Sequence, residues 1–168
     1  GLGDVYKRQA IRAQFIDALY DLCQGFIHEI TIEMTSSLSQ NDATKKELIQ
    51  FSWSLNDIFH GQFQSEEDSD FLWALAEIYR DIGYYERALP LLDSLDTLYS
   101  QLYGEGNIKL ASVWNSRGMI QYELSHFPAA LNAYQTSRDI YEKNHPAGSY
   151  SPSERIDLAK LDLNIGKT

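Results

Sequence analysis

Apolar residues recur at the spacing of amphipathic helices through the middle of the chain. One run comprises Phe71, Leu72, Leu75, Ile78, Tyr79 and Ile82. A second run comprises Ala88, Leu91, Leu92, Leu95, Leu98 and Leu102. Residues at i, i+3, i+4 and i+7 lie on one face of a helix, so each run predicts a helix that buries one face.

The pattern is written twice, because the segment 82–89 returns 42 residues later as 124–131. A fixed period between about 20 and 50 residues is typical of a repeat array. Gly83 separates the two helical runs, where a tight turn needs a residue that tolerates positive φ. Ala76 and Ala88 are small where two helices of a hairpin would cross. Each unit is therefore predicted to be a helical hairpin that buries its remaining apolar surface by stacking on a neighbour.

These residues resemble the tetratricopeptide repeat family. The family's alternation of small and aromatic residues is carried in the first unit by Ala76, Tyr79, Gly83, Tyr85, Ala88 and Leu92. In the second unit it is carried by Trp114, Gly118, Ser125, Phe127, Ala130 and Tyr134. The resemblance covers about Phe71 to Gly166 and implies an all-α fold, an α-solenoid of antiparallel helical hairpins.

The period differs from the usual tetratricopeptide unit of about 34 residues. The joint between units, 104–111, is similar to that of the longer subclass found in kinesin light chains. That joint usually carries Asn-His-Pro; Asn107 stands there in the first copy and Asn144-His145-Pro146 in the second. Arg117 and Gln121 depart from the family pattern, because an aliphatic and an aromatic residue are usual at their positions.

The chain is predicted to have three parts. Residues 1–9 resemble the in-frame translation of a transposase adaptor used to prepare sequencing libraries, and would then be foreign to the fold. Residues 10–62 are interpreted as a degenerate N-terminal helical repeat region. Residues 63–168 are interpreted as the tetratricopeptide-like array, with about two full repeats and the first helix of a third. Both ends are expected to be cuts in a longer protein.

Several helix ends can be predicted from capping residues. Ser65-x-x-Asp68 and Thr44-x-x-Glu47 have the spacing of helix starts. Ser151-Pro152-Ser153-Glu154 combines an N-cap, a first-turn proline and a glutamate three residues on.

Glycine and proline give the remaining boundaries. Pro128 is expected in the first turn of its helix, whereas Pro90 lies inside a helix that should begin near Tyr84. Gly166 is expected in the inter-helix turn of the third hairpin.

Charge and cysteine content limit the classes of partner. The net charge of −10 argues against nucleic acid and anionic membranes, since phosphate contacts need clustered Lys and Arg. The negative net charge is compatible with two interpretations, solubility alone or a basic peptide partner. Cys23 is the only cysteine and lies in an apolar run, so a buried thiol is expected. No apolar run approaches the roughly 18 residues of a membrane span. A cytoplasmic protein is therefore expected.

No motif in the chain carries recognisable chemistry. Gly166-Lys167-Thr168 lacks the glycine that a phosphate-binding loop needs five positions earlier, where Leu161 stands. His28-Glu29 lacks the second histidine of a zinc protease, because position 32 is Ile. Carboxylates are abundant but have no identifiable nucleophile or cleft. We therefore expect no catalytic residue, no metal and no cofactor, and a protein that is not an enzyme.

The family resemblance implies a concave groove lined by the first helix of each hairpin. Mapped by position, the residues expected to bind a partner there are Asp70, Trp73, Glu77, Arg80, Asn115, Met119, Tyr122 and Glu123. Asn115 matches an asparagine that in related arrays bonds the backbone of an extended peptide, although a solvent-facing role is equally open. Trp73 could instead pack against the next hairpin.

The first functional hypothesis is a non-catalytic scaffold that binds a peptide or protein in this groove. The alternative is a regulatory or sensor array of a larger enzyme, such as a protease, kinase or NTPase. A third possibility is self-association through the unfinished terminal hairpin.

Overall fold

The structure is a computed structural model that describes residues 5–15, 18, 20, 32, 42–59, 62–145 and 150–168. Every element of this described part is helical, which confirms the predicted all-α fold. The chain divides into two compact units, residues 1–75 and 76–168. Residues 5–15 form a helix that runs across the predicted boundary between residues 9 and 10.

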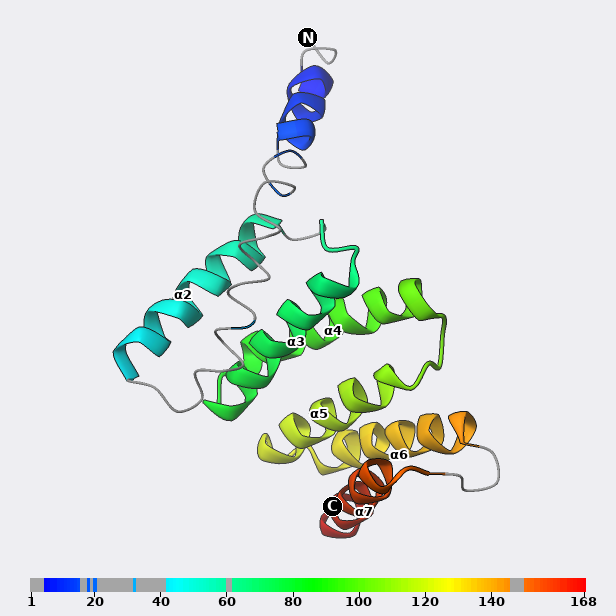
Figure 1. Ribbon diagram of the computed structural model, residues 1–168. Coiled ribbons are helices and arrows are strands. Elements are labelled where there is room, and N and C mark those ends of the chain that lie inside the picture. Colours follow the sequence, from blue (N-terminus) through cyan, green and yellow to red (C-terminus); the bar gives the residue numbers. More distant parts are fainter. Residues whose placement is uncertain are drawn as a thin grey trace. The chain divides into compact units, whose positions relative to one another are not determined.

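The named helices follow one another, and the described residues between them form no strand (Figure 1). They are α2 (Asp42–Phe59), α3 (Glu66–Asp81), α4 (Tyr85–Tyr103), α5 (Lys109–Glu123), α6 (Phe127–Asn144) and α7 (Pro152–Lys167). Helix α3 crosses the division between the two units, which are described separately below.

The first unit has an aromatic core around Tyr20. Its ring packs edge-on against Phe59 and Phe63, with centroids 5.3 and 6.1 Å away, and its hydroxyl donates to the buried carboxylate of Asp68. The other carboxylate oxygen of Asp68 accepts from the backbone N–H groups of Gln64 and Ser65, both at 2.8 Å. Asp68 therefore caps the start of α3, as the Ser65–Asp68 spacing predicted.

The predicted start of α2 at Thr44 is wrong. The helix begins at Asp42, so Thr44 already lies inside it. Cys23, for which a buried thiol was expected, lies outside the described residues.

In the second unit, α5 and α6 form an antiparallel hairpin and α7 packs against α6 (Figure 1). The inner face of α4 buries Ala88, Leu91, Leu92, Leu95 and Leu98, as the apolar pattern predicted. Ile82 and Leu102 were placed on the same apolar faces but are exposed, because both lie at helix ends.

The crossing of α5 and α6 depends on Gly118. A Cβ atom built on Gly118 would lie 2.5 Å from two ring carbons of Tyr134. The Tyr134 ring therefore occupies the space that any larger residue at position 118 would need. This close approach gives a physical reason for the glycine and the tyrosine, two of the residues that carry the family resemblance in the second unit.

The two hairpin turns have the same backbone hydrogen bonds. Gly83 donates to the Arg80 carbonyl at 3.0 Å, and Ser125, 42 residues later, donates to the Tyr122 carbonyl at 2.8 Å. Both turn residues have positive φ, +81° at Gly83 and +61° at Ser125. Ser125 thus holds a left-handed conformation that favours glycine.

Asparagines organise the joints between hairpins. Asn107 Nδ2 donates to the carbonyls of Tyr99 and Gly104, and its Oδ1 accepts from the Lys109 backbone. Asn144 Nδ2 donates to Ile140, within its own helix, and to the Gly106 carbonyl of the preceding joint at 2.9 Å. The second asparagine therefore connects consecutive joints.

The predicted starts of α6 and α7 are confirmed. Pro128 lies in the first turn of α6, and Ser151 and Glu154 form a reciprocal capping box at the start of α7. Helix α4 begins at Tyr85, which leaves Pro90 inside it.

The prediction for Gly166 is wrong, because α7 continues through Gly166 to Lys167. The surroundings of Gly166 are open, with no neighbouring atom within 4 Å of a Cβ built there.

Candidate functional site

One polar cluster of the second unit joins α3 to α5. Arg80 Nη1 donates to Glu77 Oε1 at 2.5 Å and to Ser116 Oγ at 3.0 Å. Ser116 Oγ donates in turn to Glu77 at 2.9 Å, and Arg80 also pairs with Asp81. Burial opposes the charge of Arg80, but Glu77 and Asp81 outweigh it and raise its pKa. We call Glu77, Arg80, Asp81 and Ser116 the closed cluster, because its members satisfy one another.

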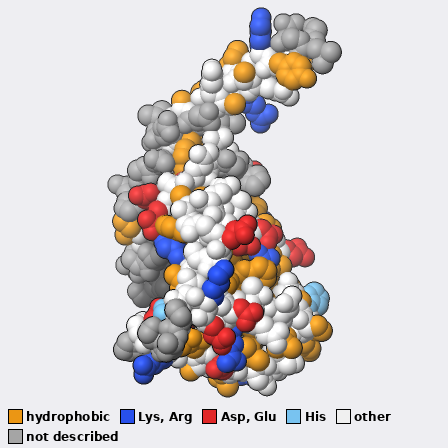
Figure 2. Space-filling model, turned by 90° about the vertical axis from the view of Figure 1, so that its right-hand side faces the viewer, with side chains coloured by type: hydrophobic (Ala, Val, Ile, Leu, Met, Phe, Trp, Pro, Cys, Tyr) orange, Lys and Arg blue, Asp and Glu red, His pale blue; other side chains and the backbone are white. Residues whose placement is uncertain are grey.

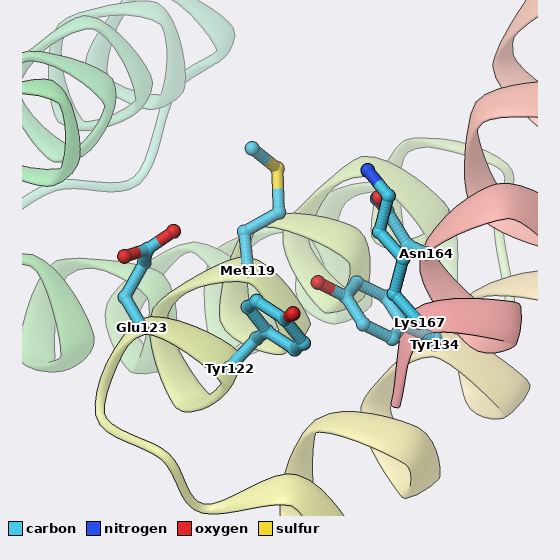
Figure 3. A pocket seen from close by; sticks show the side chains of 6 residues that line it. All are labelled: Met119, Tyr122, Glu123, Tyr134, Asn164 and Lys167. Carbon is cyan, nitrogen blue, oxygen red and sulfur yellow. The ribbon is translucent and has the colours of Figure 1, made fainter.

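A pocket of about 200 Å³ lies between the ends of α5 and α7, with α6 beneath. Met119, Tyr122 and Glu123 come from the last two turns of α5, and Asn164 and Lys167 come from the last turns of α7. Tyr134 reaches the pocket from α6. In Figure 3, Met119 stands between the Glu123 carboxylate on one side and Tyr134, Asn164 and Lys167 on the other.

Tyr134 is the most deeply placed residue of this pocket, with only 2% of its surface exposed. Its ring is fixed by the contact with Gly118, and its hydroxyl forms no hydrogen bond within the described part of the chain. The oxygen is not one of the fully buried polar atoms that lack a partner in the described structure, so it is accessible from the pocket. Tyr134 therefore presents a fixed polar atom that is available to a ligand.

The electrostatics of the pocket keep this hydroxyl neutral. Burial, together with the neighbouring Tyr122 and Glu123, raises the pKa of Tyr134 to about 12. A neutral phenol can both donate and accept a hydrogen bond. Tyr122 is held in place by an edge-on contact with Phe127, with ring centroids 5.5 Å apart.

The structure brings together three of the eight predicted groove residues in this pocket, namely Met119, Tyr122 and Glu123. Glu77 and Arg80 instead belong to the closed cluster, where their charged groups bind one another.

The other three predicted groove residues lie outside the pocket. Asn115 is half-buried, and its Oδ1 is buried without a hydrogen-bond partner in the described structure. Asp70 is exposed and Trp73 half-buried on α3, both in the first unit.

Sequence reasoning missed Tyr134, Asn164 and Lys167 as lining residues. Tyr134 was recognised only as a packing residue, although its partner Gly118 shows that the ring must lie close to α5. Asn164 and Lys167 were missed because Gly166 was assigned to a turn. A helical reading of 152–167 would have placed both on one face, three residues apart.

The described residues contain no cluster of three or more His, Cys, Asp or Glu side chains arranged to hold a metal ion. No helix in the described ranges is long and apolar enough to cross a membrane. On the face drawn in Figure 2, acidic and basic side chains are interspersed, so that face has no large area of a single charge.

The successive hairpins, the shared hydrogen-bond pattern of their turns and the pocket between first helices define an α-helical repeat protein. Residues 69–143 match the family model described as the tetratricopeptide repeat. Comparisons with curated proteins and with solved structures gave no match. Tetratricopeptide repeats generally mediate protein–protein interaction, and the fold is typically a non-catalytic scaffold.

Proposed function

We propose that the chain is a non-catalytic interaction module that binds a peptide segment of a protein partner across the ends of α5 and α7. The observation that carries the proposal is the pocket itself, with the Tyr134 hydroxyl at its base accessible to a ligand. A peptide backbone offers both donors and acceptors, which suits a neutral phenol and the Asn164 amide.

The walls of the pocket support the same proposal. Met119 and Tyr122 provide a flexible thioether and a flat ring, side-chain types that contribute strongly to protein interfaces. A volume of about 200 Å³ suits one or two side chains of a partner rather than a whole helix. The closed cluster contributes rigidity between α3 and α5, and not contacts to the partner.

The experiment is a selection from a random linear peptide library displayed on phage, followed by affinity measurement of the selected peptides. Met119→Ala should weaken their binding by about tenfold, which corresponds to about 1.4 kcal/mol. Leu163→Ala is the matched control, because Leu163 is an exposed apolar residue of α7 that does not line the pocket. Peptides that bind the Met119→Ala, Tyr122→Ala double variant as tightly as the parent protein would refute the proposal.

A further inference from the structure

We propose that the pocket takes a lysine or arginine side chain of the bound peptide, with its charged head at Glu123 and its backbone toward Asn164 and Lys167. This inference rests on the proposed function and specifies the chemistry of the partner.

The first argument is the availability of Glu123. Its carboxylate lines the pocket and forms no hydrogen bond or ion pair within the described part of the chain. Three other glutamates of the second unit are paired, Glu77 with Arg80, Glu142 with Arg138 and Glu154 with His145, whereas Glu86 and Glu105 are unpaired in the described structure. Glu123 differs from Glu86 and Glu105 in that it lines this pocket, where a cationic ligand would give it a partner.

The second argument is the shape and composition of the wall beside Glu123. Met119 stands between Glu123 and Tyr134 in the view of Figure 3, and Tyr122 lies next to it. The aliphatic stem of a lysine or arginine can cover a thioether while its head stays with a carboxylate. The faces of tyrosine rings attract the same cations.

The third argument is the sign of the potential at the base of the pocket. Burial is the main cause of the raised pKa of Tyr134, and the nearby Tyr122 and Glu123 add to it. The Glu123 carboxylate favours a cation beside it, and the Tyr134 oxygen can accept a hydrogen bond from that cation. The net charge of −10 acts in the same direction at long range.

The position of Lys167 indicates how the bound residue is oriented in the pocket. It lies with Asn164 on the side of Met119 opposite to Glu123 (Figure 3), and it forms no ion pair with Glu123. Both side chains can donate to a carbonyl, so the backbone carbonyl of the bound residue fits this end. An acidic side chain placed here would gain Lys167 but would bring a second negative charge into the pocket with Glu123.

The test uses the two methionines of the chain, Met34 and Met119. The protein is labelled with ¹³C-methyl methionine, and Met34→Leu assigns the two signals. The probes are acetylated and amidated Gly-Gly-X-Gly-Gly peptides in which X is arginine, lysine, citrulline, norleucine or glutamate. Citrulline is the decisive control, because it has nearly the shape of arginine without its charge.

The arginine and lysine peptides should shift the Met119 signal, and the citrulline and norleucine peptides should bind at least about threefold more weakly. Glu123→Gln should remove this difference. Glu86→Gln removes an equal charge from an exposed site in the first turn of α4 and should leave the difference unchanged.

Two outcomes would overturn the inference. Equal binding of the arginine and citrulline peptides, or preferred binding of the glutamate peptide, would show a peptide site with the wrong charge assigned, and the proposed function would stand. If no probe shifts Met119, the basic pocket is refuted; whether the groove binds peptides at all is then decided separately by the phage selection and its Met119→Ala variant.

Discussion

Two polar clusters of the second unit differ in how far the chain satisfies them. In the closed cluster, the charges of Arg80 and Glu77 meet across one short bond, and Ser116 bonds to both. In the pocket between α5 and α7, the Tyr134 hydroxyl and the Glu123 carboxylate have no partner in the described structure. One cluster is complete within the chain, and the other is complete only with a ligand or water.

The closed cluster stabilises the packing of α3 on α5, whereas the pocket between α5 and α7 is available to bind a partner. Arg80, with 17% of its side chain exposed, already has three partners within the chain, Glu77, Asp81 and Ser116. Glu123 is exposed and unpaired, so a ligand displaces only water from it. A charged residue on a predicted binding face can therefore serve either purpose, and its hydrogen bonds decide which.

The largest effect should come from Gly118→Ala, which tests the packing of Tyr134 at the base of the pocket. The added methyl group meets the Tyr134 ring at 2.5 Å, so overpacking should lower the free energy of unfolding by about 2–3 kcal/mol. Urea unfolding measures the change. Gly166→Ala is the control: it places the same methyl group in open space on α7 and should be neutral or slightly stabilising. Equal destabilisation by both changes would contradict the assigned contact.

Arg80→Ala tests the closed cluster. It should lower the free energy of unfolding by about 1–2 kcal/mol, because Glu77 and Ser116 lose a half-buried charged partner. Peptide affinity should change little.

Arg138→Ala is the comparison for that change. Arg138 pairs with Glu142 and Asp162 at the surface, and its loss should cost less than about 0.5 kcal/mol. An Arg80→Ala variant that keeps its stability but loses peptide binding would show that Arg80 takes part in binding the peptide.

Ser125→Gly should sharpen the comparison by making the two hairpin turns identical. Ser125 has φ +61°, and glycine adopts this conformation without the steric cost of a Cβ. We expect the free energy of unfolding to rise by about 0.5–1 kcal/mol. Gly83→Ser should lower it by a similar amount, measured in the same urea titration. A destabilised Ser125→Gly variant would show that the serine side chain contributes more than its backbone strain costs.

The smallest effect is a pH dependence of α7, which carries one wall of the pocket. Hydrogen bonds from Ser151, and then the contact with His145, lower the pKa of Glu154 below its usual value of 4.5. The stabilisation is therefore fully present above about pH 4.5 and is lost as the pH falls through the lowered pKa.

NMR signals of α7 should report this loss while those of α5 stay unchanged. Glu154→Gln should remove the pH dependence, because an amide does not titrate in this range. Simultaneous changes in α5 and α7 would argue against a local effect of the capping box.

Much of the fold could be predicted because its determinants are local. Helical periodicity, the need for positive φ at Gly83 and the capping spacing of Ser151 with Glu154 each depend on a few neighbouring residues. Met119, Tyr122 and Glu123 were assigned to one surface because the family resemblance mapped them onto the first helix of a hairpin, which lines the expected groove.

The remaining features depend on pairs that are distant in sequence. Arg80 bonds to Ser116 across 36 residues, and only the side-chain geometry shows that Arg80 is satisfied within the chain. Lys167 reaches the pocket because α7 continues past Gly166, where glycine alone suggested a turn. A glycine can end a helix or can be tolerated within it, and the choice depends on packing that the local sequence does not contain.

The double hydrogen bond of Asn144 has a mechanical consequence. Its amide nitrogen holds the last turn of α6 through Ile140 and the earlier joint through Gly106. Neither hairpin can slide along the other without breaking one of these bonds. Under a pulling force, the two hairpins would resist shear together until the hydrogen bond from Asn144 to the Gly106 carbonyl breaks. They would then extend in separate steps.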